Sequence, residues 1–172
     1  HQPALELAEK VASLCDGEVH GLQSRVKTIP KTFEKTKEHL QDLFQKGHPL
    51  VGICSSGILI RSLADVLSDK HTEPPVLAVA EDGSCVIPLL GGHHGANELA
   101  RKIASGLGVL AAVTTAGDLK FGIALDQPPE DLTLANPEDA PVFMAELLNG
   151  ASVRVEGGLS LIHISEPTRQ SP

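Results

Sequence analysis

The sequence predicts an α/β fold: a Rossmann-like, three-layer sheet with helices on both faces, followed by a partial small α/β segment. Three observations lead to this prediction. Short apolar runs alternate along the chain with longer segments whose apolar residues recur at helical spacing. Glycine and proline, 16 and 12 in 172 residues, separate these segments. Aromatic residues are scarce, so the core must be aliphatic, which suits strands covered by helices.

In the first half of the chain, the pattern of apolar residues predicts helices and strands in alternation. Apolar spacing indicates the helices, compact apolar runs indicate the strands, and a turn of small residues precedes the last helix. In order, the predicted elements are a helix over 5–14, a strand over 18–22, a helix from Phe33 that closes at Gly47, a strand over 50–54 and a helix over 58–67.

The second half continues the pattern with a reversal of chain direction. Pro74 and Pro75 end the preceding helix, and the apolar run 76–80 predicts a strand. Asp82-Gly83 indicates a tight turn, so Val86 and Ile87 are expected to return as a hairpin partner. The glycine-rich run 91–95 then precedes a predicted helix over 97–107, a strand over 110–114 and a polar exit over 115–118.

A change of composition from Phe121 onward indicates a second, smaller unit. Prolines punctuate this region before a predicted helix over 142–148 and a strand over 152–155. The stretch from Leu159 has no periodicity that continues the pattern before it. We therefore expect a first domain over 1–118, with its first strand missing, a truncated second one over 119–157 and a non-native or unstructured tail over 158–172.

Charge and cysteine content exclude several classes of function. The formal net charge of -8 disfavours binding to nucleic acid and to anionic membrane surfaces. No apolar run is long enough to cross a bilayer, and no signal-peptide pattern opens the chain, which predicts a cytoplasmic protein. The three cysteines are far apart in sequence and form no CxxC pair, so neither a disulfide framework nor a zinc motif is expected.

Four motifs in a fixed order resemble one known family. They are GICSSGILIR at 52–61, DK at 69–70 with EP at 73–74, VIPLLGGHHGANEL at 86–99, and VTTAGD at 113–118. Together they are similar to the amino-terminal domain of the cobalamin-biosynthesis protein CbiG, and residues 121–156 resemble the start of that family's central domain. The glycine-histidine motif looks most like the form fused to precorrin-3B C(17)-methyltransferase. The family usually has Asp-Pro at Glu73-Pro74 and Ser-Gly-His at 91–93, with a longer turn.

The resemblance implies an activity. It is the hydrolysis of cobalt-precorrin-5A, in which a δ-lactone ring opens and a two-carbon unit leaves as acetaldehyde. It implies no redox cofactor, and cobalt would arrive with the tetrapyrrole substrate instead of occupying a metal site of the protein. A fused or associated precorrin methyltransferase is the expected partner. The alternative is a non-catalytic corrinoid-binding or docking module of such a bifunctional protein. A nucleotide-binding Rossmann module is disfavoured because no GxGxxG or Walker motif is present.

His93 and Glu98 are the candidate catalytic residues. Lactone opening needs a base that activates water near neutral pH, where histidine titrates. We interpret His93 as that base, although the shorter turn leaves His94 as an alternative, and Glu98 as the group that orients it or manages the departing proton. The structural alternative is that both histidines are solvated and that Glu98 only favours the start of its helix. Adjacent histidines without a third spaced ligand do not predict a zinc site.

The remaining candidates are polar groups at the ends of predicted strands, where open α/β sheets bind ligands. Backbone N–H groups of the glycine-rich turns and an arginine suit a substrate that carries many carboxylates. Each has a structural alternative, such as helix capping by Asn97 or a solvated Arg61. The candidate substrate-binding residues are Ser55, Ser56, Gly57, Arg61, Gly92, His94, Asn97, Thr114, Thr115 and Asp118, with Lys70 and Glu73 as further possibilities.

The predicted hairpin raises a topological question about this set. A reversal at Asp82-Gly83 would place the residues 55–61 and 93–98 at opposite edges of the sheet, unless residues 88–92 cross back over the edge. One polar hollow would then not contain both groups.

Overall fold

The structure is a computed structural model that describes residues 2–26, 28–121 and 133–154. Within these ranges the side chains of residues 2, 3, 93, 118 and 121 are not described. The chain divides into two compact units, residues 1–113 and residues 114–172.

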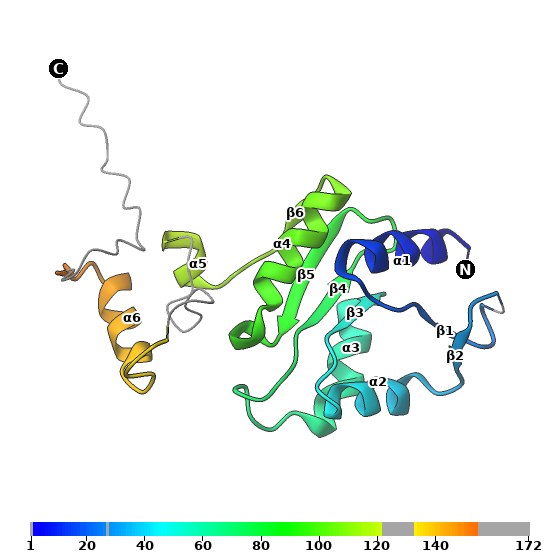
Figure 1. The fold of residues 1–172 in the computed structure, drawn as a ribbon, viewed down its shortest axis with the longest axis horizontal. Helices are drawn as coiled ribbons and strands as arrows, with labels where there is room; N and C mark the ends of the chain where they lie inside the picture. Colours follow the sequence, from blue (N-terminus) through cyan, green and yellow to red (C-terminus); the bar gives the residue numbers. More distant parts are fainter. Residues whose placement is uncertain (1, 27, 122–132, 155–172) are drawn as a thin grey trace, which may run out of the picture. The chain divides into compact units, whose positions relative to one another are not determined.

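Unit 1 contains the sheet, and its elements follow the predicted alternation (Figure 1). The helices are α1 (Gln2–Cys15), α2 (Thr36–Gln45), α3 (Ser56–Leu63) and α4 (Ala96–Leu107), with short 3-10 turns η1 (Ala64–Val66) and η2 (Gly92–His94). The strands are β1 (His20–Leu22), β2 (Lys31–Phe33), β3 (Leu50–Ile53), β4 (Val76–Val79), β5 (Cys85–Leu90) and β6 (Leu110–Ala111).

The main sheet is mixed, with the strand order β3-β4-β5-β6. β3 runs parallel to β4, β5 runs antiparallel to β4, and β6 runs parallel to β5. The predicted hairpin is confirmed: Gly83 has φ +72° at the turn, and its N–H donates to the carbonyl of Ala80 at 2.8 Å. The Asp82 side chain accepts a hydrogen bond from the N–H of Ser84 at 3.0 Å, which closes the turn.

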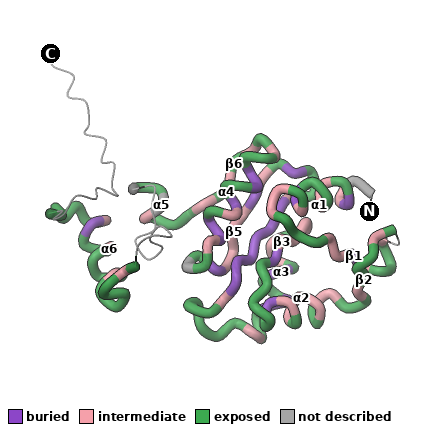
Figure 2. The backbone as a smooth tube through the Cα atoms, in the orientation of Figure 1, coloured by how far each residue is buried: buried purple, intermediate pink, exposed green. Residues whose placement is uncertain are grey.

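β4 is buried along its whole length and supplies both faces of the core (Figure 2). Leu77 and Val79 pack with residues of α1 and α4, whereas Val76 and Ala78 pack with residues of α2 and α3. Successive side chains of a strand point to opposite faces, so helices cover the sheet on both sides. The predicted α/β class, a sheet layered between helices, is confirmed.

β1 and β2 form a separate two-stranded parallel ribbon between α1 and α2. The sequence interpretation placed Phe33 at the start of a helix, and this was wrong because Phe33 is the last residue of β2. Its ring stacks on His39 of α2, with centroids 4.4 Å apart, so it contacts the helix without belonging to it. An apolar residue at helical spacing from a helix therefore does not show where that helix begins.

Two strand predictions after α4 were also wrong in extent. The strand expected over 110–114 is limited to Leu110–Ala111, and residues 116–121 form a helix, α5 (Ala116–Phe121), instead of a polar exit. The strand expected over 152–155 is not formed at 152–154, while Val155 lies outside the described residues. The described part of unit 2 therefore consists of helices.

Unit 2 contains α5 and α6 (Ala140–Leu148). The Lys120 ammonium on α5 donates to the carbonyl of Leu148, the last residue of α6, at 2.8 Å. A cation at the carboxyl end of a helix is favoured by the unpaired carbonyls and the helix dipole. This contact joins the two helices within their own unit.

A pair of substitutions on α3 tests the packing of unit 1. Leu63 is 0% exposed and Ile60 is 51% exposed on the same helix. We expect Leu63→Ala to lower the free energy of unfolding by about 2–5 kcal/mol, because it removes buried methyl groups and leaves a cavity. Ile60→Ala is expected to cost about 0.5 kcal/mol or less. Urea denaturation followed by circular dichroism measures both, and equal losses would contradict the layered core.

Candidate functional site

The glycine-rich turn at the end of β5 is held by glycines in the left-handed backbone region. Gly91 has φ 74° and Gly95 has φ 83°, and they bracket the short turn η2. The carbonyl of Gly91 accepts hydrogen bonds from the N–H groups of His94 and Ala96, at 2.9 and 3.2 Å. Residues other than glycine rarely adopt this left-handed backbone conformation. This explains why a glycine stands on each side of the histidines.

Gly91 also allows the turn to pack directly against another loop. A Cβ at Gly91 would lie 2.5 Å from the carbonyl carbon and oxygen of Pro74, closer than real contacts permit. At Gly92, by contrast, a Cβ would meet nothing within 4 Å. The contact brings the backbone of the loop before β4, which carries Lys70 and Glu73, to the turn. Lys70 is exposed, and Glu73 is half-buried.

The first turn of α4 presents Glu98 toward the glycine turn. Its carboxylate lies over Gly95, 3.9 Å from where a Cβ on that glycine would be. The carboxylate accepts a weak contact from Arg101 at 3.5 Å, and its side chain is 55% exposed. Glu98 therefore remains accessible to solvent and to a ligand. The His93 side chain lies outside the described residues, and His94 is exposed.

Asn97 occupies a different position from the one expected of a capping residue. The residue that precedes α4 as its cap is Gly95, and Asn97 lies inside the first turn. Asn97 is buried, with 7% of its surface exposed. The capping interpretation of Asn97 was therefore wrong, because the glycine turn extends the helix one residue further back than the sequence indicated.

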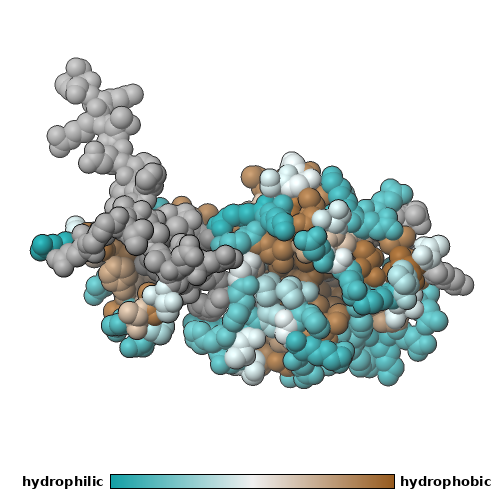
Figure 3. All heavy atoms as spheres, in the orientation of Figure 1, coloured by the Kyte–Doolittle hydropathy of each residue, from teal (hydrophilic) through white to brown (hydrophobic). Residues whose placement is uncertain are grey.

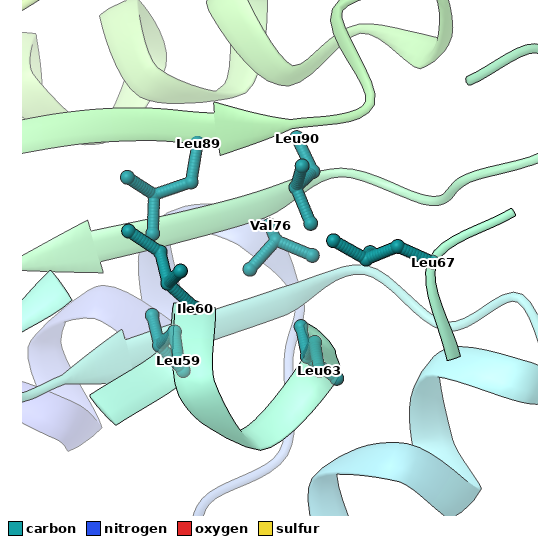
Figure 4. Close-up of a pocket in the computed structure, with 7 residues that line it drawn as sticks. All are labelled: Leu59, Ile60, Leu63, Leu67, Val76, Leu89 and Leu90. Carbon is teal, nitrogen blue, oxygen red and sulfur yellow. The ribbon is translucent and has the colours of Figure 1, made fainter. Parts of the chain in front are cut away.

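An apolar groove opens beside the same end of β5. It has a volume of about 220 Å³ and lies between α3 and the paired ends of β4 and β5 (Figure 4). Leu89 and Leu90 come directly before the glycine turn, and Val76 pairs with Leu90 across the strands. Val76 pairs with Leu90 and Leu77 with Pro88, so Leu89 is an extra residue on β5, and both leucines lie on the groove side. The lining residues are Leu59, Ile60, Leu63, Leu67, Val76, Leu89 and Leu90.

The groove is partly open to solvent. In the space-filling view, apolar side chains gather in the middle of unit 1, and hydrophilic ones surround them (Figure 3). Ile60 and Leu67 contribute to the groove while remaining 51% and 37% exposed. The sequence analysis did not identify these residues as functional, because their helical spacing is the same as that of ordinary core residues.

The second group of predicted residues lies around the start of α3. Ser55 precedes the helix as its cap residue, and Ser56 begins it. The Arg61 guanidinium folds back over Gly57, where its Nη1 is 3.0 Å from the position that a Cβ would take. Gly57 therefore provides space for Arg61. The four residues form one cluster at the carboxyl end of β3.

This cluster and the glycine turn lie at opposite ends of the sheet. Leu50, Val76 and Leu90 align across the three strands at one end, and Ile53, Val79 and Val86 align at the other. β5 keeps its antiparallel pairing through Leu90, so the chain does not cross back. The two groups are separated by the length of β4, roughly 10 Å at the usual rise per residue. The separation that the predicted hairpin implied is therefore present, and one hollow does not contain both groups.

Thr114, Thr115 and Asp118 belong to unit 2. The carbonyl of Thr115 accepts a hydrogen bond from Leu119 at 3.1 Å, at the start of α5. Asp118 lies within α5, and its side chain is outside the described residues. The interpretation that these residues leave a strand was wrong, because the strand ends at Ala111.

Three further kinds of feature were considered within the described residues: a metal site, a reactive thiol and a membrane-spanning helix. The described residues contain no group of three or more His, Cys, Asp or Glu side chains arranged to hold a metal ion. Burial, with a smaller contribution from Glu81, raises the pKa of the Cys54 thiol above its usual value, which disfavours the reactive thiolate. Among the described helices, none has the length and apolar character needed to cross a membrane.

Comparison with known proteins matches the part of the chain that holds both groups. The family described as Cobalamin synthesis G N-terminal matches residues 38–118. Residues 38–118 are therefore similar to the CbiG amino-terminal domain. Every candidate site residue of this chain, from Ser55 to Asp118, lies within this domain, and the recognition made from the motifs is confirmed over it.

Two curated relatives of the CbiG domain carry the same name, Cobalt-precorrin-5A hydrolase. The one from Priestia megaterium is 40% identical over 88 residues, which are 51% of this chain and 24% of the relative. The one from Salmonella typhimurium is 44% identical over 78 residues, which are 45% of this chain and 22% of the relative. The matched part of the chain thus spans about a quarter of the length of each relative.

A solved structure also resembles the chain. It is a crystal structure described as that of a cobalamin biosynthesis protein G homologue from Sulfolobus solfataricus. The TM-score is 0.49 at 19% identity, and the match covers 92% of this chain and 49% of that chain.

The neighbouring glycines of the turn provide a matched pair of substitutions. Gly91→Ala forces a methyl group into the backbone of Pro74 and imposes a left-handed conformation on alanine. We expect it to lower the free energy of unfolding by about 1–3 kcal/mol or more. Gly92→Ala meets open space and should change it by about 0.5 kcal/mol at most. Urea unfolding measures the difference, and equal stability of the two variants would contradict the close approach of Pro74.

Proposed function

We propose that the protein is a cobalt-precorrin-5A hydrolase, which opens the δ-lactone ring of its substrate with release of acetaldehyde. The observation that carries the proposal is the arrangement beyond the end of β5, where the glycine-histidine turn links the strand residues that line the apolar groove to the helix that carries the accessible Glu98 carboxylate. The name shared by the two curated relatives, at 40% and 44% identity, supports the same reaction.

In the proposed reaction, water adds to the lactone carbonyl and the ring oxygen leaves. His93 is the proposed general base, which takes the proton from the attacking water, because an imidazole titrates near neutral pH. The ring oxygen leaves on the two-carbon unit and becomes the carbonyl oxygen of acetaldehyde as the carbon–carbon bond to the macrocycle breaks. The electron pair of that bond stays on the macrocycle, which takes up the proton that water gave up. Glu98 is the group proposed to manage this proton or to orient His93, since its carboxylate faces the turn from the first turn of α4. His94 remains the alternative base on the same turn.

The macrocycle would be bound by two kinds of surface. At about 220 Å³, the groove is smaller than the usual pocket for a whole ligand, so it suits one apolar edge of the ring. The positive end of the α4 dipole would favour peripheral carboxylates, with Gly92, His94 and Asn97 nearby. Lys70 and Glu73 lie on the loop that packs against the turn. Ser55, Ser56, Gly57 and Arg61, at the other end of the sheet, are not part of this proposed site.

We further propose that the protein needs no resident cofactor and that cobalt arrives with the substrate. A precorrin methyltransferase, fused or associated, is the proposed partner in the same pathway. The net charge of -8 supports a protein that binds neither nucleic acid nor a membrane surface. A cytoplasmic location follows from the proposed pathway role.

Acetaldehyde release from cobalt-precorrin-5A tests the proposal. We expect the unmodified protein to release one acetaldehyde per lactone opened, measured by coupled oxidation of NADH with alcohol dehydrogenase. His93→Gln removes the base and should reduce kcat by about 10²–10⁴-fold. Glu98→Gln keeps the size of the side chain and should reduce kcat less, with KM nearly unchanged.

Lys102→Gln is the matched control, because Lys102 is an exposed residue of the same helix one turn beyond Glu98. It should retain full turnover. Full turnover by His93→Gln and by the matching His94→Gln would overturn the assignment of the base. A change in the visible spectrum of the corrinoid without acetaldehyde would instead show the non-catalytic binding module.

A further inference from the structure

Two histidines outside the proposed site share a hydrogen bond across two elements of unit 1. Nδ1 of His20, on β1, lies 2.9 Å from Nε2 of His39, on α2. The rings are tilted by 35°, with their centroids 5.0 Å apart. The Phe33 ring stacks on His39, with the ring centroids 4.4 Å apart and an angle of 10° between the ring planes. The pair therefore joins the β1-β2 ribbon to α2.

The proton count of this pair decides whether the bond exists. In an N–H···N bond one ring nitrogen donates and the other must accept, so at least one of His20 and His39 must be neutral. If both rings are protonated, both nitrogens carry hydrogen, and two cations face each other at 2.9 Å. The same contact is then repulsive. A bond between two imidazoles is thus stable only above a certain pH.

The surroundings disfavour a proton on His39. Glu18 Oε2 lies 3.8 Å from Nε2 of His20, on the far side of that ring from His39. Burial is the main reason that the pKa of His39 is lowered, and the neighbouring His20 lowers it further. Asp42 raises this pKa and Lys46 lowers it, and these two side chains are paired with each other at 2.7 Å.

The other charged groups around the pair are themselves paired. On the ribbon, Glu18 is bonded to Lys31, which lowers the pKa of the Glu18 carboxyl and keeps it ionised in mild acid. Within the described residues, β3, which also packs on α2, carries no titratable side chain. The remaining ion pairs of α2 are Lys35 with Glu38 and Lys37 with Asp65 of η1, and on α3 the charged residue is Arg61, which lies over Gly57.

We propose that His20 and His39 form an acid-sensitive latch, which holds the β1-β2 ribbon against α2 while the pair carries at most one proton and releases it when both rings are protonated. The latch lies where the chain passes from α1, in one helical layer, to α2, in the other. α2 is tied to α3 by the Gln41 side chain, which donates to the carbonyl of Ser62 at 2.9 Å. Opening the latch would therefore weaken the packing of α2 against α3, the helix that lines the groove.

The direction of the pH effect follows from the lowered pKa of His39. In the unfolded chain His39 takes up a proton around its ordinary pKa of 6.5, whereas in the folded chain it does so only at lower pH. Below about pH 6.5 the unfolded or opened state therefore binds more protons, and the latch weakens as the pH falls. Above that pH its contribution is fully present. Each unit of pKa difference corresponds to about a tenfold change in the opening equilibrium.

Amide hydrogen exchange of the 172-residue chain, compared at pH 7.5 and pH 5, tests the latch. After correction for intrinsic exchange rates, we expect protection factors of β1 and β2 to fall about tenfold in acid, while those of β4 stay unchanged. His39→Gln provides a neutral amide at the same place and should abolish the pH response. His48→Gln, at an exposed histidine, is the control and should keep it.

Two results would overturn the latch. One is equal loss of ribbon protection in the unmodified chain and in His39→Gln, and the other is no loss in the unmodified chain. Because His39→Gln also removes the ring that stacks on Phe33, histidine ring titration by NMR on the unmodified chain provides an independent measurement. Two separate steps, with His39 titrating below 6.5, support the latch, whereas a single step shared by both rings at 6.5 contradicts it.

Discussion

The fold depends on the burial of β4 from both sides. All four residues of Val76–Val79 are buried, and because successive side chains of a strand alternate, each residue belongs to one of two separate aliphatic cores. A strand in this position needs neighbours on both edges and helices on both faces. β3 and β5 provide the edges, α1 and α4 cover one face, and α2 and α3 cover the other.

This dependence explains which elements the sequence predicted well. The buried strands are continuous aliphatic runs, and the helices that cover them show helical spacing, so both signals come from the core itself. The hairpin was predictable because Gly83 must adopt φ +72°. Elements that depend on one long-range contact were missed. β2 forms by pairing with β1, and Phe33 appeared helical because it faces α2 from outside the helix.

The candidate site was predictable in its residues but not in its arrangement. Motif spacing identified the glycine turn with Glu98, and the structure adds the reason for the spacing, which is the left-handed backbone at Gly91 and Gly95. The contact between Gly91 and Pro74 joins segments that are distant in sequence, and no local pattern signals it. The groove was missed for a similar reason, because leucines at its wall have the same spacing as core leucines.

The antiparallel β5 also changes what the general rule for ligand sites in α/β sheets predicts here. That rule places ligands beyond the carboxyl ends of parallel strands, which in this sheet is the end with Ser55 and Arg61. Reversal of β5 puts its own carboxyl end at the opposite edge, beside the amino ends of β3 and β4. At that end the chain passes from the β5 residues that line the apolar groove, through the glycine turn, into the start of α4. A mixed sheet therefore has to be examined strand by strand, and for this chain the direction of β5 decides which loops act together.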